Sequence, residues 1–199
     1  MPFGAPVGAM DDPSGVLRSE HEAISHLLDS LDGIAGRIRA DDVVPKDDLL
    51  DAMIVASDFA DRCHQGKEED VLFPALVKAS PRGPEIVGRL TAEHMSLRKL
   101  IDAIRMTIPD TSTRKAARKS LVRSLTAYSK LLREHMRLEH QVLLPEVERA
   151  IPKEERARIA QAFVRVERDI IGLGMHAAYD SIIQRLAAEY RRAPQAAVV

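Results

Sequence analysis

Four histidines and two glutamates carry the clearest chemical signal in this sequence: His21, His64, Glu68, His94, His135 and Glu139. The second and fourth of these histidines each precede a glutamate by four residues. On a helix, residues four apart lie about 40° apart around the axis and one turn apart along it, so each pair can reach one point. Imidazole and carboxylate groups are common ligands of transition metals. We therefore predict that these six side chains form a metal site.

An internal repeat places the same groups in two matching sets. Glu20-His21 recurs 73 positions later as Glu93-His94, and the stretch from residue 64 to 74 recurs 71 positions later, from 135 to 145. Both copies of the longer stretch have His, Glu, three apolar residues and Pro in the same register. The repeat predicts two similar helix pairs related by a pseudo-twofold axis. Each pair would supply two histidines and one glutamate.

Apolar stripes at helical spacing surround these groups, which makes their burial costly. Each unsatisfied buried polar group costs roughly 1–3 kcal/mol of folding free energy. A bound cation would turn that cost into a stabilising interaction. A lone histidine in a stripe is more simply a satisfied core residue, and a His/Glu pair at this spacing can serve only to stabilise a helix. Six groups in register favour the metal. Four imidazoles and two carboxylates without a thiolate are typical of two iron ions rather than structural zinc, with manganese and zinc as alternatives.

Neighbouring polar residues are predicted to lie outside this site. His26 and His140 each follow a predicted ligand histidine by five residues, or about 140° of helix, and are interpreted as surface residues. Glu69 follows His64 by five residues, and the same angle excludes it as a metal ligand. Cys63 is offset by about 100° from the stripe and is interpreted as a small side chain that packs in the interior rather than as a metal ligand.

Five amphipathic segments must position these residues. Turn chemistry separates them at roughly 14–40, 46–79, 84–107, 111–150 and 152–192. Short links make consecutive helices antiparallel, and an up-down-up-down order brings the four histidines to the same end of a bundle. We predict an all-α chain with a tail at 1–13, a four-helix bundle at 14–150, a C-terminal helical extension at 151–192 that packs on the bundle, and a tail at 193–199.

Composition narrows the class of protein. The 199 residues are 45% hydrophobic and 30% charged, with a formal net charge of −1, which gives no general attraction for nucleic acid. The apolar runs are too short to span a bilayer and the first residues lack a signal peptide pattern. A single cysteine excludes an intramolecular disulfide, so we expect a cytoplasmic protein. We expect the chain to be a monomer or a homodimer.

The order of the six residues resembles the hemerythrin-like (HHE) cation-binding family. The resemblance covers about residues 14–150 and includes the stretch His64-Gln65-Gly66-Lys67-Glu68-Glu69 followed by Leu72-Phe73-Pro74. It implies an antiparallel four-helix bundle with two iron ions in an oxo- or hydroxo-bridged centre, bridged by Glu68 and Glu139, with the histidines as terminal ligands. The chain departs from the oxygen-carrying members at Leu90, where they have a further histidine, and at Glu139, where they have aspartate. These departures argue against reversible oxygen carriage.

Three functions are compatible with these residues. The first is a di-iron protein that binds or processes a small oxidant or gas, namely dioxygen, peroxide or nitric oxide, with or without enzymatic turnover. The second is an iron- or oxygen-responsive sensor module without catalysis. The third is a metal-free helical scaffold for interactions. For the first, the pseudo-twofold predicts that His21 and His64 bind one iron and that His94 and His135 bind the other.

The fifth segment has no counterpart in the oxygen carriers. We expect a break near Gly172–Gly174, because glycine weakens a helix by up to about 1 kcal/mol relative to alanine. An apolar stripe should pack on the bundle, formed by Ile159, Phe163, Val166, Ile170 and Leu173. His176 is interpreted as a surface or hydrogen-bonded residue. The alternative is that His176 or Glu167 supplies the ligand missing at Leu90.

Overall fold

The computed structural model describes residues 12–110, 115–170, 172 and 175–190, and those residues are helical with short links. The elements in chain order are α1 (Pro13–Arg39), α2 (Lys46–Ile54), η2 (Val55–Gln65), η3 (Glu68–Leu72), α3 (Phe73–Ala79), α4 (Gly83–Thr107), η4 (Ile108–Asp110), α5 (Lys115–Leu138), η5 (Glu139–Leu143), α6 (Leu144–Ala150), α7 (Lys153–Ile170) and α8 (Met175–Tyr190). The described ends of the five predicted segments agree with these bounds within a few residues. Most of the 1–13 tail, all of the 193–199 tail and the start of the fourth segment at 111–114 lie outside the described residues.

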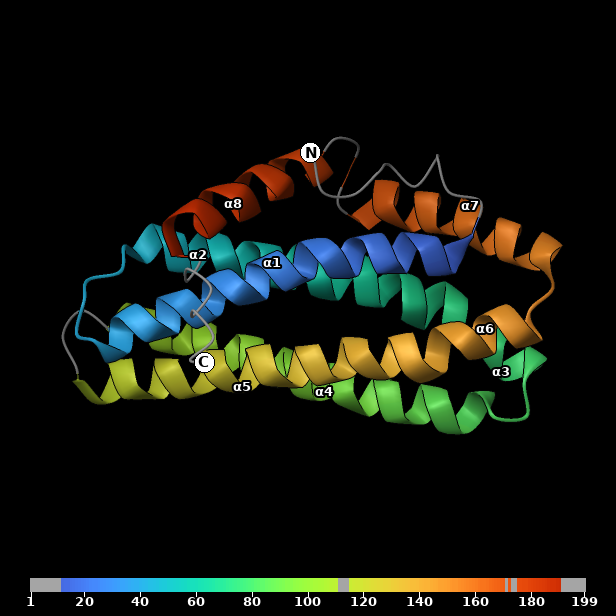
Figure 1. Ribbon diagram of the computed structural model, residues 1–199, viewed down its shortest axis with the longest axis horizontal. Coiled ribbons are helices and arrows are strands. Elements are labelled where there is room, and N and C mark those ends of the chain that lie inside the picture. The colour runs from blue at the N-terminus through green and yellow to red at the C-terminus, as the bar shows by residue number, and fades with distance from the viewer. Residues whose placement is uncertain (1–11, 111–114, 171, 173–174, 191–199) are drawn as a thin grey trace, which may run out of the picture.

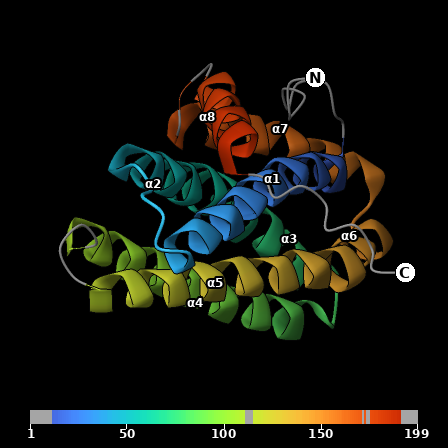
Figure 2. The same ribbon diagram turned by 60° about the vertical axis from the view of Figure 1, so that its left-hand side comes forward.

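Four antiparallel rods form the bundle (Figure 1). They are α1, the continuous run from α2 to α3, then α4, and the run from α5 to α6. α5 packs beside both α1 and α4. In Figures 1 and 2, α7 and α8 lie across the outside of the bundle, over α1 and α2. The predicted helical bundle with a C-terminal extension is confirmed. No helix among the described residues is long and apolar enough to cross a membrane.

Local sequence explains how the first rod begins. Asp12 is the N-cap of α1, where its side chain accepts a hydrogen bond from the Ser14 amide at 3.0 Å, and Pro13 occupies the first helical turn. A short acidic side chain satisfies an amide that has no partner within the helix, and proline is favoured there because its missing N–H costs nothing. Arg37 and Arg39 in the last turn interact favourably with the negative end of the helix dipole.

Prolines shape the second and fourth rods at equivalent positions. η3 and η5 are π-helical turns, and each ends just before a Phe-Pro or Leu-Pro pair at Pro74 or Pro145. A proline inside a helix cannot donate to the carbonyl four residues earlier, so the turn before it widens. The Glu68 and Glu139 carbonyls accept from the amide five residues on. Both predicted ligand glutamates therefore stand at the first residue of a π turn.

Two apolar clusters fill the bundle, and the predicted metal ligands lie between them. The larger cluster includes Ile24, Leu97 and Leu132, and the smaller one includes Leu17 and Leu90. On α1, Leu17 belongs to the smaller cluster and Ile24 to the larger one, and His21 lies between them. The same alternation holds on the other rods. The ligands form a polar layer sealed at both ends by packed aliphatic side chains.

The C-terminal extension breaks where the glycines predict. α7 ends at Ile170 and α8 begins at Met175, and Gly172 has a positive φ of 83° that favours glycine. In the predicted stripe, Ile159 and Phe163 are buried in the smaller cluster, while Val166 and Ile170 are half-buried. Leu173 lies outside the described residues. α7 therefore packs on the bundle mainly through its first half.

α8 returns along the outside of α1 and anchors at its end. Gly33 on α1 faces the Tyr190 backbone so closely that a Cβ at this position would clash with the carbonyl. The Tyr190 hydroxyl donates a hydrogen bond to Asp48, and Arg185 forms ion pairs with Asp48 and Asp51. The last turn of α8 is thus held against both α1 and α2.

Candidate metal centre

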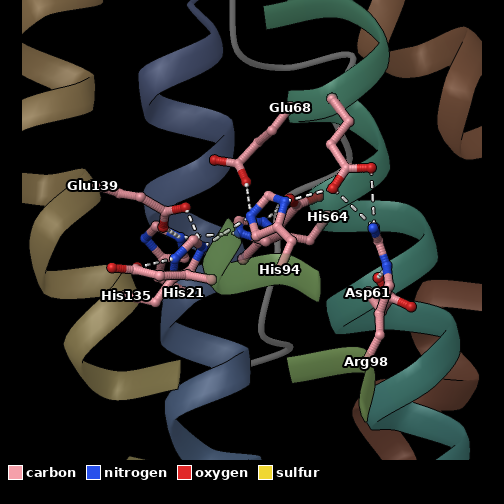
Figure 3. A network of polar contacts seen from close by, with 11 residues as sticks. His21, Asp61, His64, Glu68, His94, Arg98, His135 and Glu139 are labelled. Atoms are coloured by element: carbon pink, nitrogen blue, oxygen red, sulfur yellow. Dashed lines mark hydrogen bonds and ion pairs between the residues drawn. The ribbon is translucent and has the colours of Figure 1, made fainter. Parts of the chain in front are cut away.

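The six predicted ligands meet in the polar layer between the two apolar clusters (Figure 3). His21 comes from α1, His94 from α4, and the two His/Glu pairs come from the second and fourth rods. Five of the six side chains are fully buried, and His21 is 3% exposed. The structure brings these six side chains together in one buried layer, and their role as metal ligands stays a prediction.

The four histidines face each other in two pairs. The Nε2 atoms of His21 and His64 are 3.1 Å apart, and those of His94 and His135 are 3.0 Å apart. Two nitrogens bound to one metal at about 2.0–2.1 Å would be separated by about 2.8–3.4 Å for bond angles between 90° and the tetrahedral angle. The observed separations fall in that range. The pairing in space is the one that the pseudo-twofold predicts.

The two glutamates supply oxygens that nothing else satisfies. All four carboxylate oxygens of Glu68 and Glu139 are buried, and none has a hydrogen-bond partner among the described residues. Nearby imidazoles lie within ion-pair distance of them, at 2.9 Å from His21 Nε2 and 2.7 Å from His135 Nε2 to Glu139, but outside hydrogen-bond geometry. His94 Nε2 lies 3.3 Å from Glu68. Buried anions without donors are costly, so this space is suited to a cation.

The donor atoms converge in two overlapping groups. Glu68, His94, His135 and Glu139 offer atoms within 4.8 Å of one another, and so do His21, His64 and Glu139. Glu139 belongs to both groups. Its two oxygens therefore occupy the place of a carboxylate shared between two ions.

A ring of outer residues orients the imidazoles through Nδ1. The Nδ1–H groups of His64 and His135 donate to Glu20 at 2.9 Å and to Glu93 at 2.8 Å. A carboxylate on Nδ1 fixes the tautomer and directs the Nε2 lone pair inwards, as in most metal sites with histidine ligands. Where both rings of a pair are neutral in this way, two lone pairs face each other, and either a cation or a shared proton between them removes the repulsion. Glu20 and Glu93 are the residues before His21 and His94, so the repeat contained this signal.

Two residues that were predicted to lie outside the site contact its histidines. Glu69 belongs to neither donor group, but it accepts a hydrogen bond from His94 Nδ1 at 2.6 Å. His140 is solvent-exposed, as predicted, yet its Nε2 lies 2.7 Å from His21 Nδ1. Both residues belong to π turns, in which the angle between successive residues is smaller than the 100° of a regular α-helix. His26 is half-buried and is absent from both donor groups.

The electrostatics of the layer show its need for positive charge. Burial and the nearby Glu139 raise the pKa of Glu68. Burial would also raise the pKa of Glu139, but His135 and His21 hold it well below its ordinary value. Burial would lower the pKa of His135, yet Glu139, Glu93 and Glu68 outweigh it and raise that pKa to about 10. Burial lowers the pKa of His21 to about 4. Without metal, a proton on His135 supplies charge that a cation could provide.

A buried lysine connects this centre to the C-terminal extension. Lys67 is fully buried, donates to Glu20, and lies 3.2 Å from Glu167 on α7. His176 Nε2 lies 3.1 Å from Glu167. Burial would raise the pKa of Glu20, but Lys67 and His64 lower it to about 2. Sequence analysis missed Lys67, because its partners are far away in the chain.

The residues suggested as a replacement ligand have other partners. Leu90 is fully buried in the smaller apolar cluster, and Glu167 is bound by Lys67 and His176. Glu167 therefore has partners of its own and belongs to none of the groups among the described residues that could hold a metal ion. His176 is half-buried, its Nε2 lies 3.1 Å from Glu167 but outside hydrogen-bond geometry, and its ring packs edge-on against Phe59. Cys63 is buried, and burial raises the pKa of its thiol to about 12.

Comparison with known proteins adds one positive finding. The family model described as the hemerythrin HHE cation binding domain matches residues 12–147, which include all six predicted ligands. Searches of curated proteins and of solved structures gave no significant match.

Proposed function

We propose that this chain, which belongs to the hemerythrin HHE cation-binding domain family, holds two iron ions and uses them to bind or process a small oxidant or gas. The ligands of the metals would be His21, His64, Glu68, His94, His135 and Glu139. Dioxygen, peroxide and nitric oxide are the candidate small ligands. When bound, the metals would supply Lewis acidity and redox chemistry.

One observation carries this proposal: the four carboxylate oxygens of Glu68 and Glu139 are buried without hydrogen bonds to any described residue, while imidazole nitrogens face the same space. A metal-free scaffold would have to bury these two carboxylates against little more positive charge than the proton on His135. Glu139 belongs to both donor groups, which supports a bridging role. The same role for Glu68 rests on the repeat, in which it occupies the equivalent position.

Some of the chain's own residues would hold the ligand imidazoles in place, and others would shield the centre from water. Glu20, Glu93 and Glu69 keep three imidazoles in the orientation that presents Nε2. The apolar clusters on both sides exclude water from the layer. With apolar Leu90 where the oxygen carriers have a histidine, fewer protein ligands would leave positions for an external molecule.

Metal analysis of the purified chain, together with an absorption spectrum, tests the proposal. We expect about two iron ions per chain and near-ultraviolet bands of a bridged ferric pair, because there are two half-sites. A fully metallated sample that contains one zinc ion and no iron would contradict it. Peroxide-turnover and gas-binding assays on the iron-loaded chain then separate catalysis from binding.

A sensor function is a second candidate, favoured by the contacts of Lys67. This residue joins Glu20, behind the imidazole of His64, to Glu167 on α7. A change in metal charge or occupancy could therefore alter how α7 is held. Metal-dependent protection of α7 from amide hydrogen exchange, without turnover of any small oxidant, would favour the sensor over the enzyme.

A further inference from the structure

The centre meets solvent on one side, at a pocket between α1 and the fourth rod. This pocket has a volume of about 420 Å³ and is lined by Arg18, His21, Glu22, Ser25, Met136, Arg137, His140 and Gln141. His21 is the one predicted ligand with measurable exposure, at 3%. The exposed His140 contacts His21 directly. The pocket thus reaches the imidazole of a predicted ligand.

The repeat identifies the equivalent location on the opposite side of the centre, between α4 and the second rod. His94 replaces His21 there, and Glu69 replaces His140. The residue 73 positions after Ser25 is Arg98. Its guanidinium forms ion pairs with Glu69 at 3.0 Å and with Asp61 at 2.7 Å. In Figure 3, Arg98 and Asp61 stand at one edge of the cluster, and His135 and Glu139 lie towards the opposite edge.

The two sides differ mainly in the size of the side chain at this repeat position. Ser25 is short and its hydroxyl turns back to donate to the His21 carbonyl at 2.7 Å, so it extends little into the pocket. Arg98 reaches across to the second rod and covers Glu69 beside His94, which is fully buried. Serine on one side and arginine on the other make one side open and the other covered.

Charge at the pocket favours an anion. Arg18 and Arg137 line it together with a single acidic residue, Glu22, and Arg18 also forms an exposed ion pair with Glu148 at 3.4 Å. The corresponding positions in the repeat, Thr91 and Gly66, carry no charge. Exposed cations raise the local concentration of small anions and their association rate, and salt weakens this effect.

We propose that this pocket is the entrance through which a small anionic ligand reaches the metal position of His21 and His64, that Ser25 keeps it open, and that Arg98 closes the related side. The inference rests on the proposed metal centre. It adds the route, the charge class of the ligand and the residue that controls access.

Stopped-flow binding of azide to the iron-loaded full chain tests this entrance. Ser25→Arg should slow both association and dissociation of azide by about tenfold or more, with little change in Kd, because a blocked route affects both directions equally. Ser96→Arg is the matched control, since Ser96 is exposed on α4 and also donates to the carbonyl four residues earlier. This control should keep the wild-type rates. Wild-type association should also slow as salt concentration rises.

A second variant distinguishes a blocked entrance from a distorted metal centre. In Ser25→Arg combined with Arg98→Ser, the open and covered sides exchange, and the azide association rate should return towards that of the wild type. Unchanged rates in Ser25→Arg, or a changed Kd with no recovery in the combined variant, would overturn the entrance while leaving the metal centre in place. A chain that holds no iron, or whose iron binds no azide, would instead refute the proposed function and the entrance with it.

Discussion

Replacing Lys67 with methionine tests the charge balance behind the centre. Lys67 is fully buried and its ammonium group contacts Glu20 and Glu167. Methionine keeps most of the volume and removes the charge, leaving the Glu20 carboxylate buried without a cation. Removing one partner of a buried ion pair costs about 3–5 kcal/mol of folding free energy.

The lowered pKa of Glu20 gives a similar magnitude for Lys67 and His64 acting together against burial. The difference between its ordinary value of 4.5 and about 2 in the folded chain corresponds to roughly 3 kcal/mol, at about 1.36 kcal/mol per pH unit. A lowered carboxyl pKa contributes this stability fully above pH 4.5, and the contribution is lost as the pH falls from there towards 2. Unfolding is therefore best measured at pH 7.

Urea unfolding followed by circular dichroism, at matched metal content, measures the loss. We expect Lys67→Met to lose about 3 kcal/mol, and Lys67→Met with Glu20→Gln to lose less than the two single losses added together, because the unpaired charge is gone. Lys130→Met is the control, since Lys130 is exposed and pairs with Glu134 at 3.9 Å, and it should cost about 0–1 kcal/mol. A loss below about 1 kcal/mol in Lys67→Met, or strictly additive losses, would refute the reasoning.

Three further predictions test the centre and the packing around it. Glu139→Ala should remove both metal ions, because this carboxylate belongs to both donor groups, while Glu134→Ala on the same rod should retain about two per chain by elemental analysis. Gly33→Ala should lower thermal stability by about 1–3 kcal/mol through a clash with the α8 backbone. Gly88→Ala, which meets nothing within 4 Å, should instead stabilise α4 by up to about 1 kcal/mol. Cys63 should resist a thiol reagent at pH 8 until urea unfolds the chain, because its thiol is buried and its pKa is raised to about 12.

The helical period was enough to predict which residues line the centre. His21 and His94 replace aliphatic residues in regular stripes, and the repeat fixed the register of both His/Glu pairs, so their convergence followed from the geometry of antiparallel rods. The break at the glycines was also visible, because local chemistry decides where a helix ends.

Other features depend on contacts that a one-dimensional pattern does not contain. Glu69 and His140 were placed by a regular 100° step, which fails in the π turns before Pro74 and Pro145. Prolines inside two long helical segments were the available signal for such turns. The ion pair between Lys67 and Glu20 joins residues 47 apart in the chain, and burial of a lysine is rare enough that the sequence favours an exposed one.

The repeat duplicates the inner donors but does not duplicate the groups behind them. Glu69 corresponds to the neutral or cationic His140, and Lys67 corresponds to Leu138. The imidazole pair of His94 and His135 therefore has two outer carboxylates, each paired with an arginine, whereas the other pair has one outer carboxylate, which is paired with a buried lysine. Outer carboxylates increase the basicity of a histidine ligand. Two ions held by these donor groups would consequently differ in how strongly they are bound, and the pocket at His21 opens on the side that has one outer carboxylate rather than two.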